Sequence, residues 1–172
     1  MERREMGLVQ KLGTEEAPLE ITLEDEGATA ALATALAAMA RSGDVLALWG
    51  GLGTGKTAFA RAFINALALK PEDVPSPTFT LVQVYDTAVF PLYHFDLYRL
   101  ERPSEVFELG IEDAFAEGIS LIEWPERLGG YIPADRLDLT LSHRPADTDT
   151  NRRYAHLSGL GSWARRIKEL KT

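Results

Sequence analysis

The chain has 172 residues, of which 45% are hydrophobic and 26% charged, and this suits one soluble domain with a buried core. It contains no cysteine, which excludes disulfides, zinc–thiolate sites and thiol catalysis and agrees with a reducing cytoplasm, where we expect the protein. The formal net charge of −8 argues against direct clamping of bare nucleic acid, and no apolar stretch reaches the roughly 18 residues of a membrane span.

The first half of the sequence predicts alternating strands and helices after a polar leader. Residues 1–18 lack a hydrophobic pattern, so we expect a flexible leader there and a single domain over residues 19–172. Asp25 is placed to cap an alanine-rich helix that Gly43 ends, and an entirely apolar run follows, typical of a strand covered on both faces. The predicted elements are strands at Leu19–Leu23 and Val45–Trp49 and helices at Glu26–Arg41 and Lys56–Ala68.

The second half predicts further strands separated by short helices. Because Pro91 cannot donate to a strand ladder, the strand before Asp96 should start there or lie at a sheet edge. The last two strands alternate cleanly, which is typical of antiparallel strands, so we expect an α/β fold: a mixed sheet flanked by helices, with antiparallel strands at its C-terminal edge. The predicted strands are Phe79–Tyr85, Phe90–Phe95, Ile119–Glu123, Leu137–Leu141 and Tyr154–Leu157, and the predicted helices are Ser104–Glu108, Glu112–Glu117 and Trp163–Leu170.

The segment Gly50–Thr57 reads G-G-L-G-T-G-K-T and matches the phosphate-binding pattern G-x-x-x-x-G-K-[ST] in full. Glycines let the backbone wrap closely enough for its N–H groups to point at phosphate oxygens. Lys56 supplies charge for the β and γ phosphates, so we expect it to lie exposed at the loop, and the Thr57 hydroxyl can ligate Mg²⁺. A buried strand before the segment and a helix after it predict a P-loop NTPase-like site.

Two acidic residues are candidates for positioning the magnesium ion. A P-loop enzyme holds its metal partly through a carboxylate, which commonly follows an apolar strand. Asp96 follows the run that begins at Phe90, and Glu123 ends the run that begins at Ile119. The sequence pattern leaves open whether one or both belong to the site.

Neighbours of these acids have simpler interpretations. His94 lies in an apolar strand and is more often a hydrogen-bonded core histidine than a base. Trp124 more often packs than functions, with gating of the site or partner contact as the alternative. The acidic stretch from Glu101 to Glu117 is typical of a solvated face, with contact to a basic partner surface as the alternative.

Beyond the P-loop, four segments form a specific combination, whereas the P-loop pattern alone is shared by many families. They are S-P-T-F-T-L-V at Ser76–Val82, H-F-D-L-Y-R-L at His94–Leu100, E-L-G-I at Glu108–Ile111 and I-E-W-P at Ile122–Pro125. On these residues the chain resembles the bacterial TsaE family, formerly called YjeE. The similarity covers roughly Leu19 to Leu157, nearly the whole predicted domain.

The resemblance implies a small ATPase that binds ATP or ADP together with Mg²⁺. TsaE proteins are required for N6-threonylcarbamoyladenosine at position 37 of tRNAs that read codons starting with A. They do not perform the carbamoyl transfer; they bind the TsaB–TsaD heterodimer, and their ATP hydrolysis supports repeated turnover of that transferase. A member of this family would meet tRNA only indirectly, through the complex, and would not contact a membrane.

The resemblance also assigns roles to residues of this chain. Thr57 and Glu123 match positions that hold magnesium, and Asp96 matches an acidic residue beside the metal. The segment Ser76–Thr80 matches a switch-like loop that senses the γ-phosphate. We therefore expect Lys56, Asp96 and Glu123 to be catalytic, and nucleotide contacts from Glu26, Gly53, Thr54, Gly55, Lys56, Thr57, Ala58 and Arg153.

Two details of the resemblance differ from a simple residue-by-residue match. Arg152 is the alternative to Arg153, because an insertion before them blurs the alignment. Gly51 stands where the family P-loop usually carries an acid. Nucleotide binding does not need that acid, but a role of the acid in metal–water contacts or partner docking would be missing here.

Two other functions share the P-loop. A small-molecule kinase usually carries an arginine-bearing lid, and between Phe79 and Pro125 the chain offers only Arg99 and Arg102 and no lid-like insertion. A GTPase-like switch would carry a guanine-reading N-K-x-D sequence, which is absent, so adenine is expected. The ATPase is therefore the leading hypothesis and the kinase its alternative.

Overall fold

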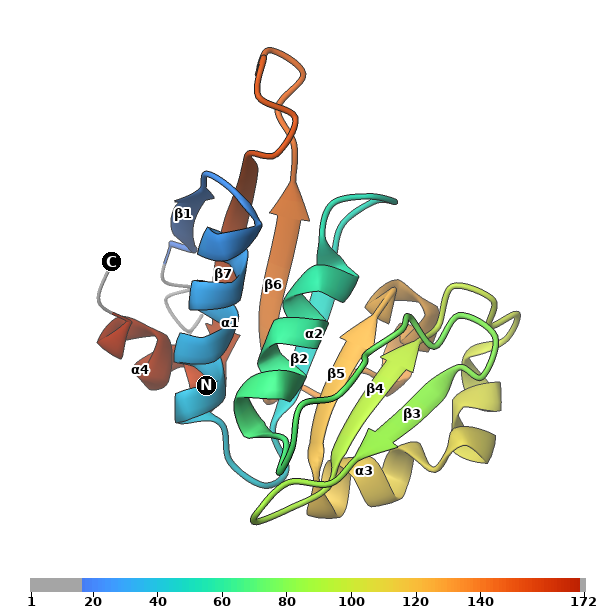
Figure 1. Ribbon diagram of the computed structural model, residues 1–172. Coiled ribbons are helices and arrows are strands. Elements are labelled where there is room, and N and C mark those ends of the chain that lie inside the picture. Colours follow the sequence, from blue (N-terminus) through green and yellow to red (C-terminus); the bar gives the residue numbers. More distant parts are fainter. Residues whose placement is uncertain (1–16, 171–172) are drawn as a thin grey trace, which may run out of the picture.

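The computed structural model describes residues 17–170, which form one sheet of seven strands with helices on both faces (Figure 1). The strand order is β1-β7-β6-β2-β5-β4-β3. The expected leader, residues 1–18, lies outside the described residues apart from its last two positions. The strands are β1 (Leu19–Leu23), β2 (Val45–Trp49), β3 (Val82–Tyr85), β4 (Leu92–Asp96), β5 (Ile119–Glu123), β6 (Arg136–Ser142) and β7 (Arg153–Leu160).

Parallel pairing occupies the centre of the sheet and antiparallel pairing its edges. β2 runs parallel to both of its neighbours, β5 and β6, and β4 runs parallel to β5. β7 is antiparallel to β6 and to β1, while β3 is antiparallel to β4. This confirms the predicted α/β fold with antiparallel strands at the C-terminal edge, and it adds an antiparallel strand, β3, at the opposite edge.

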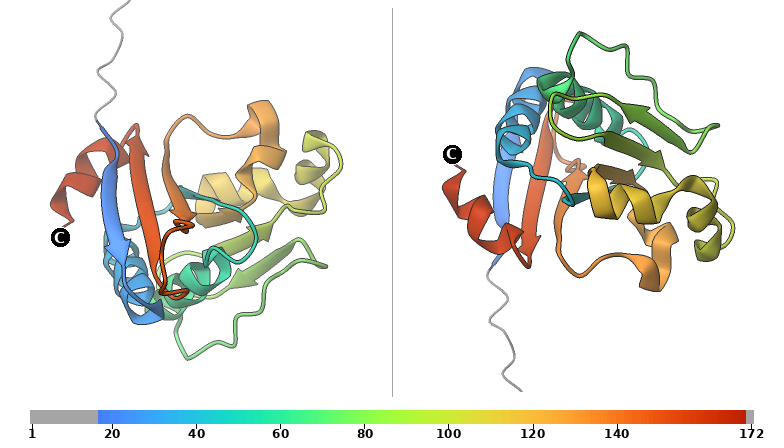
Figure 2. Two further views of the ribbon diagram at one scale, coloured as in Figure 1. Left: turned by 90° about the horizontal axis from the view of Figure 1, so that it is seen from above. Right: turned by 90° about the horizontal axis from the view of Figure 1, so that it is seen from below.

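Helices α1 (Glu26–Met39) and α2 (Lys56–Leu67) cover one face of the sheet (Figures 1 and 2). The other face carries α3 (Ile111–Glu117) and two 3₁₀ segments, Pro103–Leu109 and Pro125–Tyr131. The chain closes with α4 (Trp163–Arg166), which packs beside β7, and the 3₁₀ turn Ile167–Glu169. Within the described residues, no helix has the length and apolar character to cross a membrane.

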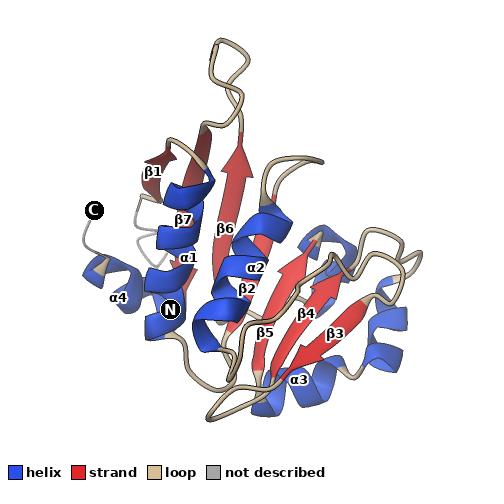
Figure 3. Cartoon of the chain, in the orientation of Figure 1, coloured by secondary structure: helices blue, strands red, loops and turns tan. Residues whose placement is uncertain are grey.

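The central strands bury side chains on both faces. Leu46 and Leu48 of β2 pack in the cluster that contains α1 and α2, whereas Val45 packs in the cluster that contains α3. Such two-sided burial explains why β2 is apolar at every position. Because β2, β4, β5 and β6 are mutually parallel, their carboxyl ends meet at one edge, and the P-loop and the loop after β6 project from it (Figure 3).

Two strands are predicted to begin two or more residues before the observed start. The strand predicted from Phe79 begins at Val82, because Leu81 has φ +67° and the chain turns there instead of extending. The strand predicted from Phe90 begins only at Leu92, directly after the proline that cannot donate to a ladder, and it lies inside the sheet.

Two helix predictions are also corrected. The first helix ends at Met39 and not at Arg41, because Ala40 is extended and the Arg41 N–H donates to Asp44 Oδ2 at 2.7 Å. The final helix, expected to be continuous, divides into α4 and a 3₁₀ turn. The 3₁₀ segment after β5 was not predicted; Pro125 at its start is its local signal.

Candidate nucleotide-binding site

The P-loop joins β2 to α2, and its glycines allow backbone conformations that leave the loop N–H groups open to a ligand. Gly50, Gly53 and Gly55 have φ values of +135°, +73° and +102°, which residues with a Cβ rarely adopt. A Cβ on Gly50 would lie 2.4 Å from the carbonyl oxygen of Leu141, so β6 also excludes a side chain there. No side chain caps the start of α2, and its first N–H groups therefore face the loop as an anion site.

Lys56 folds back over the loop, contrary to the expectation that it is exposed. The residue is 5% exposed, and Nζ donates to the carbonyl oxygens of Gly50 and Gly51, each at 2.7 Å. Nζ also lies 4.1 Å from the centre of the Trp124 ring. Burial lowers the pKa of Lys56 below its ordinary 10.5, and the nearby Glu123 carboxylate partly opposes this shift. The ammonium thus lies at the loop, held on acceptors that phosphate oxygens can replace.

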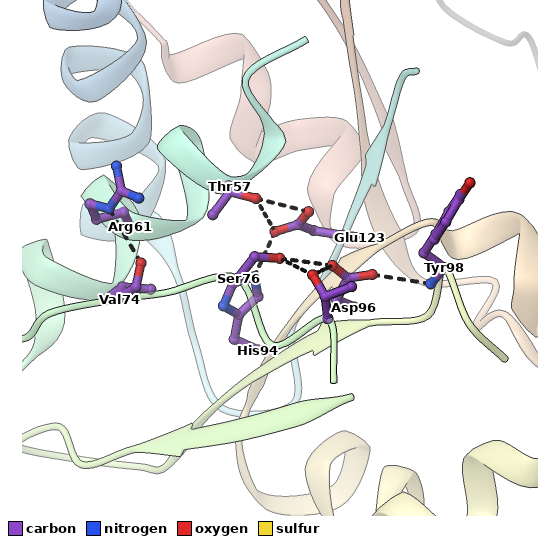
Figure 4. Close-up of polar contacts among 9 residues, drawn as sticks. Thr57, Arg61, Val74, Ser76, His94, Asp96, Tyr98 and Glu123 are labelled. Atoms are coloured by element: carbon purple, nitrogen blue, oxygen red, sulfur yellow. Dashed lines mark hydrogen bonds and ion pairs between the residues drawn. The ribbon is translucent and has the colours of Figure 1, made fainter. Parts of the chain in front are cut away.

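Glu123 ends β5 next to the P-loop. β5 pairs with β2, and Glu123 lies opposite Leu48, two residues before the loop begins. The Thr57 hydroxyl donates to the Glu123 carboxylate, with Oγ1 at 3.0 Å from Oε1 and 3.2 Å from Oε2 (Figure 4). His94 Nε2 lies 2.8 Å from Oε1. The Thr57 hydroxyl and the buried Glu123 carboxylate together offer hard oxygen ligands of the kind that Mg²⁺ prefers.

Asp96 ends β4 directly opposite Glu123 in the register but contacts a different part of the chain. Its Oδ2 accepts from Ser76 Oγ at 2.8 Å and from Thr78 Oγ1 at 3.1 Å, and its Oδ1 accepts from the Tyr98 N–H at 3.1 Å (Figure 4). Asp96 therefore fastens the Ser76–Thr80 loop to the sheet, whereas Glu123 is the carboxylate that contacts Thr57.

Backbone strain is concentrated beside these two carboxylates. Among residues 17–170, Leu81 and Trp124 are the only non-glycine residues with positive φ, at +67° and +58°. Trp124 follows Glu123 directly, and the Leu81 carbonyl accepts the N–H of Asp96 at 2.9 Å. Bulky residues adopt this conformation at an energetic cost that surrounding structure must offset, and such positions cluster at binding sites.

The P-loop and the two carboxylates enclose a cavity of about 310 Å³, within the range of small-molecule sites. The rings of Tyr98 and Trp124, with centroids 4.8 Å apart, form part of its wall. Trp124 thus packs against Tyr98 and Lys56 and borders the site, and a role in gating or partner contact stays a prediction. The lining residues are Leu52, Gly53, Thr54, Gly55, Lys56, Thr57, Ala58, Ser76, Thr78, Asp96, Tyr98, Glu123 and Trp124.

Residues expected on the nucleoside side of the loop are placed differently from one another. Arg153 Nη2 donates to the Gly53 carbonyl at 3.4 Å, whereas Arg152 pairs with Glu24 at 2.7 Å, and this hydrogen bond raises the pKa of Arg152. Of the two, Arg153 is the one that contacts the P-loop, and because neither lines the cavity, its contact with a nucleotide stays a prediction. Glu26 is exposed in the first turn of α1 and lies outside the cavity lining, so its contact with a nucleotide stays a prediction.

Two site residues were not found from the sequence. Tyr98 lines the cavity and lies two positions after Asp96, within the motif His94–Leu100. That motif is the sequence signal that could have identified it. His143, whose Nε2 lies 3.1 Å from the Gly53 carbonyl oxygen, follows β6 and carries no local signal, because only the strand order brings it to the P-loop. His94 is a hydrogen-bonded buried histidine, as expected, and its partner is Glu123.

The protein groups suit magnesium only together with phosphate. Within the described part of the chain, no group of three His, Cys, Asp or Glu side chains could hold a metal ion. Thr57 and Glu123 supply oxygens on one side of the cavity, and Asp96 lies on the next strand. Mg²⁺ commonly takes one or two carboxylates plus phosphate oxygens and water, so this incomplete set fits a metal that arrives with a nucleotide.

Known proteins resemble this chain in sequence and structure. The family model described as threonylcarbamoyl adenosine biosynthesis protein TsaE matches residues 23–154. The tRNA threonylcarbamoyladenosine biosynthesis protein TsaE of Bacillus subtilis is 41% identical over 120 residues, covering 69% of this chain and 74% of that protein. The Rickettsia felis protein of the same name is 43% identical over 121 residues, covering 70% and 71%. The crystal structure of Bacillus subtilis YdiB has a TM-score of 0.70 at 31% identity, covering 88% of this chain and 92% of that one. The chain therefore belongs to the TsaE family.

Proposed function

We propose that this protein is a Mg²⁺-dependent ATPase of tRNA threonylcarbamoyladenosine biosynthesis. The observation that carries the proposal is the hydrogen bond between Thr57 and Glu123 beside a complete P-loop. In P-loop enzymes the helix hydroxyl and a strand-end carboxylate together hold the magnesium of the bound nucleotide. Relatives covering about 70% of this chain are named for the same modification pathway, which supports the biological role.

Each group of the site has a task in this proposal. The loop N–H groups from Gly53 to Ala58 bind the phosphates of ATP or ADP, and Lys56 turns from the loop carbonyls toward the β and γ oxygens. Thr57 and Glu123 would hold Mg²⁺, which neutralises charge on the transferring phosphoryl group. Asp96 supports the metal side of the site through its hold on the Ser76–Thr80 loop. Arg153 and Glu26 would border the nucleoside.

The described cavity lacks an arginine placed for the transition state, because Arg153 contacts the P-loop only at the Gly53 carbonyl. None of the residues that line the described cavity is an arginine, and Arg99 instead lies with Cζ 4.4 Å from the centre of the exposed Phe79 ring. An arginine supplied in cis or in trans accelerates related reactions by about 10³–10⁵. We infer that a partner, the TsaB–TsaD heterodimer, completes the site, and that turnover of the transferase depends on this hydrolysis.

The acidic chain fits such an arrangement. A net charge of −8 disfavours direct RNA binding, so tRNA would be met only through the complex, in the cytoplasm. The role is that of a nucleotide-controlled subunit: ATP favours the complex and hydrolysis releases it. No transfer to a tRNA base is assigned to this chain.

The test compares steady-state ATP hydrolysis with and without TsaB–TsaD, using Glu123→Gln as the inactive control. We expect slow hydrolysis alone, stimulation by the heterodimer, and tighter complex formation with a non-hydrolysable ATP analogue than with ADP. Equal rates and equal affinities would contradict the proposal. Phosphate transfer to an added small hydroxyl compound, in place of hydrolysis, would favour the kinase alternative.

A further inference from the structure

His94 contacts Glu123 from the core side of the cavity wall. It is 0% exposed and lines no part of the cavity. It belongs to β4, where it pairs in register with Leu121 of β5, so the Glu123 carboxylate lies two residues farther along the same face. The 2.8 Å contact between Nε2 and Glu123 Oε1 spans that step (Figure 4). His94 therefore reaches the site only through Glu123.

The direction of this hydrogen bond follows from the chemistry of its partners. An ionised carboxylate only accepts, so the Nε2 atom of His94 carries the hydrogen, and in the neutral imidazole Nδ1 then has none. Within the described residues Nδ1 is buried without a hydrogen-bond partner. An apolar side chain would avoid burying that atom, so packing alone gives no reason for histidine here. The contact with Glu123 does give one.

Glu123 is held from two sides. Thr57 donates from α2, His94 donates from the sheet, and both contact Oε1, while Oε2 keeps only the longer 3.2 Å contact with Thr57. Glutamate has three rotatable side-chain bonds, so a single donor would leave its carboxylate free to turn. With the core-side donor in place, Oε2 keeps its remaining acceptor capacity for a ligand in the cavity that Glu123 lines.

We propose that His94 is a positioning residue that fixes the Glu123 carboxylate in the orientation needed to hold Mg²⁺. The inference rests on the proposed function, because it assumes that Glu123 holds the metal of the nucleotide. It assigns His94 no contact with substrate and no transfer of a proton. Partners of this kind behind a metal ligand set its orientation, and their loss typically weakens metal binding by roughly 10- to 100-fold.

The test measures how much Mg²⁺ is needed for nucleotide binding. Calorimetric titration of ADP and of a non-hydrolysable ATP analogue, with EDTA and across a Mg²⁺ series, is applied to wild type, His94→Leu and His94→Gln. We expect His94→Leu to require roughly 10- to 100-fold more Mg²⁺ while its affinity in EDTA is unchanged. His94→Gln keeps a side-chain N–H near the position of Nε2, so we expect it to restore most of the magnesium response.

Leu92→Val is the matched control, because Leu92 is equally buried on the same strand and face but does not touch Glu123. It should lower the thermal midpoint and leave the Mg²⁺ requirement unchanged. A wild-type Mg²⁺ requirement in His94→Leu, or an equal rise in Leu92→Val, would overturn the inference. If His94→Leu does not fold, His94→Gln and ¹⁵N NMR of the wild-type imidazole decide, since a hydrogen on Nδ1 in place of Nε2 also overturns it.

The two proposals fail in different ways. If wild type shows no magnesium-dependent nucleotide binding, the proposed function itself fails. If wild type shows it and Glu123→Gln loses it, but His94→Leu keeps it in full, the function stands and only the role of His94 is wrong.

Discussion

Asp96 and Glu123 lie opposite each other at the carboxyl ends of the parallel strands β4 and β5, so two carboxylates stand side by side in one cavity wall. They are 4% and 2% exposed, and each is held by hydroxyl groups from a different segment. Glu123 accepts from Thr57 of α2, whereas Asp96 accepts from Ser76 and Thr78 of the loop before β3. The pair thus connects α2 to that loop through two neighbouring strands of the sheet.

Lys56→Ala should abolish most nucleotide binding while the protein stays folded. Among the described residues, the ammonium donates hydrogen bonds only to the Gly50 and Gly51 carbonyls, and it would exchange these for phosphate oxygens. Hydrogen bonds to charged groups are worth about 1.5–3 kcal/mol, which corresponds to a loss of roughly 10- to 100-fold in affinity. Calorimetric titration with ATP measures it. Lys70→Ala, an exposed lysine beyond the end of α2, is the control. Wild-type affinity in Lys56→Ala would remove the phosphate-site assignment.

Thr57→Ala should lose turnover more than nucleotide binding. Its hydroxyl is the group that faces Glu123, and metal bound there would act mainly on charge that develops during phosphoryl transfer. We expect kcat to fall by roughly 100-fold, as when one electrostatic partner is removed from other active sites. Thr57→Ser keeps the hydroxyl and should keep most of the rate. Partner-stimulated hydrolysis measures both, and equal rates in the alanine and serine variants would show that the hydroxyl has no role.

The local elements of this site were predictable because their signals lie close together in sequence. The P-loop residues follow one another, and the apolar runs before Asp96 and Glu123 mark buried strands whatever their neighbours are. Their pairing was not predictable from the runs alone. It depends on β4 and β5 being neighbours, which is a property of the strand order.

The wrong boundary at Phe79 has the same origin. The run from Phe79 to Tyr85 has the composition of a strand, but its first part bends. The reason is that Ser76 and Thr78, just before it, are hydrogen-bonded to Asp96, some twenty residues away. Tertiary hydrogen bonds here override local β propensity. The buried position of Lys56 is a further case, because the P-loop carbonyls and the Trp124 ring, which follows β5, come together only in the folded chain.

Gly50→Ala and Gly51→Ala should differ sharply although the two positions are adjacent. A methyl group on Gly50 would meet the Leu141 carbonyl at 2.4 Å with φ at +135°, whereas none of the surrounding atoms lies within 4 Å of a Cβ on Gly51. We expect Gly50→Ala to lower the free energy of unfolding by about 1–3 kcal/mol and to impair nucleotide binding. Gly51→Ala should stay within about 0.5 kcal/mol of wild type. Urea denaturation measures both, and equal stabilities would contradict the loop geometry.

Gly51→Asp extends the same comparison to the acid that the family P-loop usually carries. The open space around Gly51 accommodates the side chain, so the fold should be unchanged. An effect confined to the partner-stimulated rate would then assign the acid to docking, and an effect on magnesium-dependent binding would assign it to the metal.

The hydroxyls of Ser76 and Thr78 should control the order of the loop that contains them. Both donate to the same oxygen of Asp96, and they lie 3.0 Å from each other, so one carboxylate oxygen organises the turn. Within residues 17–170, the double variant Ser76→Ala/Thr78→Ala leaves the buried Asp96 with the Tyr98 N–H as its remaining donor. We expect unfolding free energy to fall by about 1–3 kcal/mol, the cost of leaving a buried acceptor under-satisfied.

The loop itself should respond more than the whole protein. With its two tethers removed, amide hydrogen exchange should quicken across residues 76–81, while the N–H groups of β2 keep wild-type protection because their ladder is untouched. Thr80→Ala is the matched control, since Thr80 is exposed in the same loop. Both variants should bind ADP as wild type does, because the P-loop amides are unchanged.

If exchange in the loop were the same in the double variant and in Thr80→Ala, the contacts with Asp96 would not be what orders it. The loop would then have to be held by its backbone hydrogen bond from the Leu81 N–H to the Pro77 carbonyl, which is 2.7 Å long. The role left for Asp96 would be to help hold the metal.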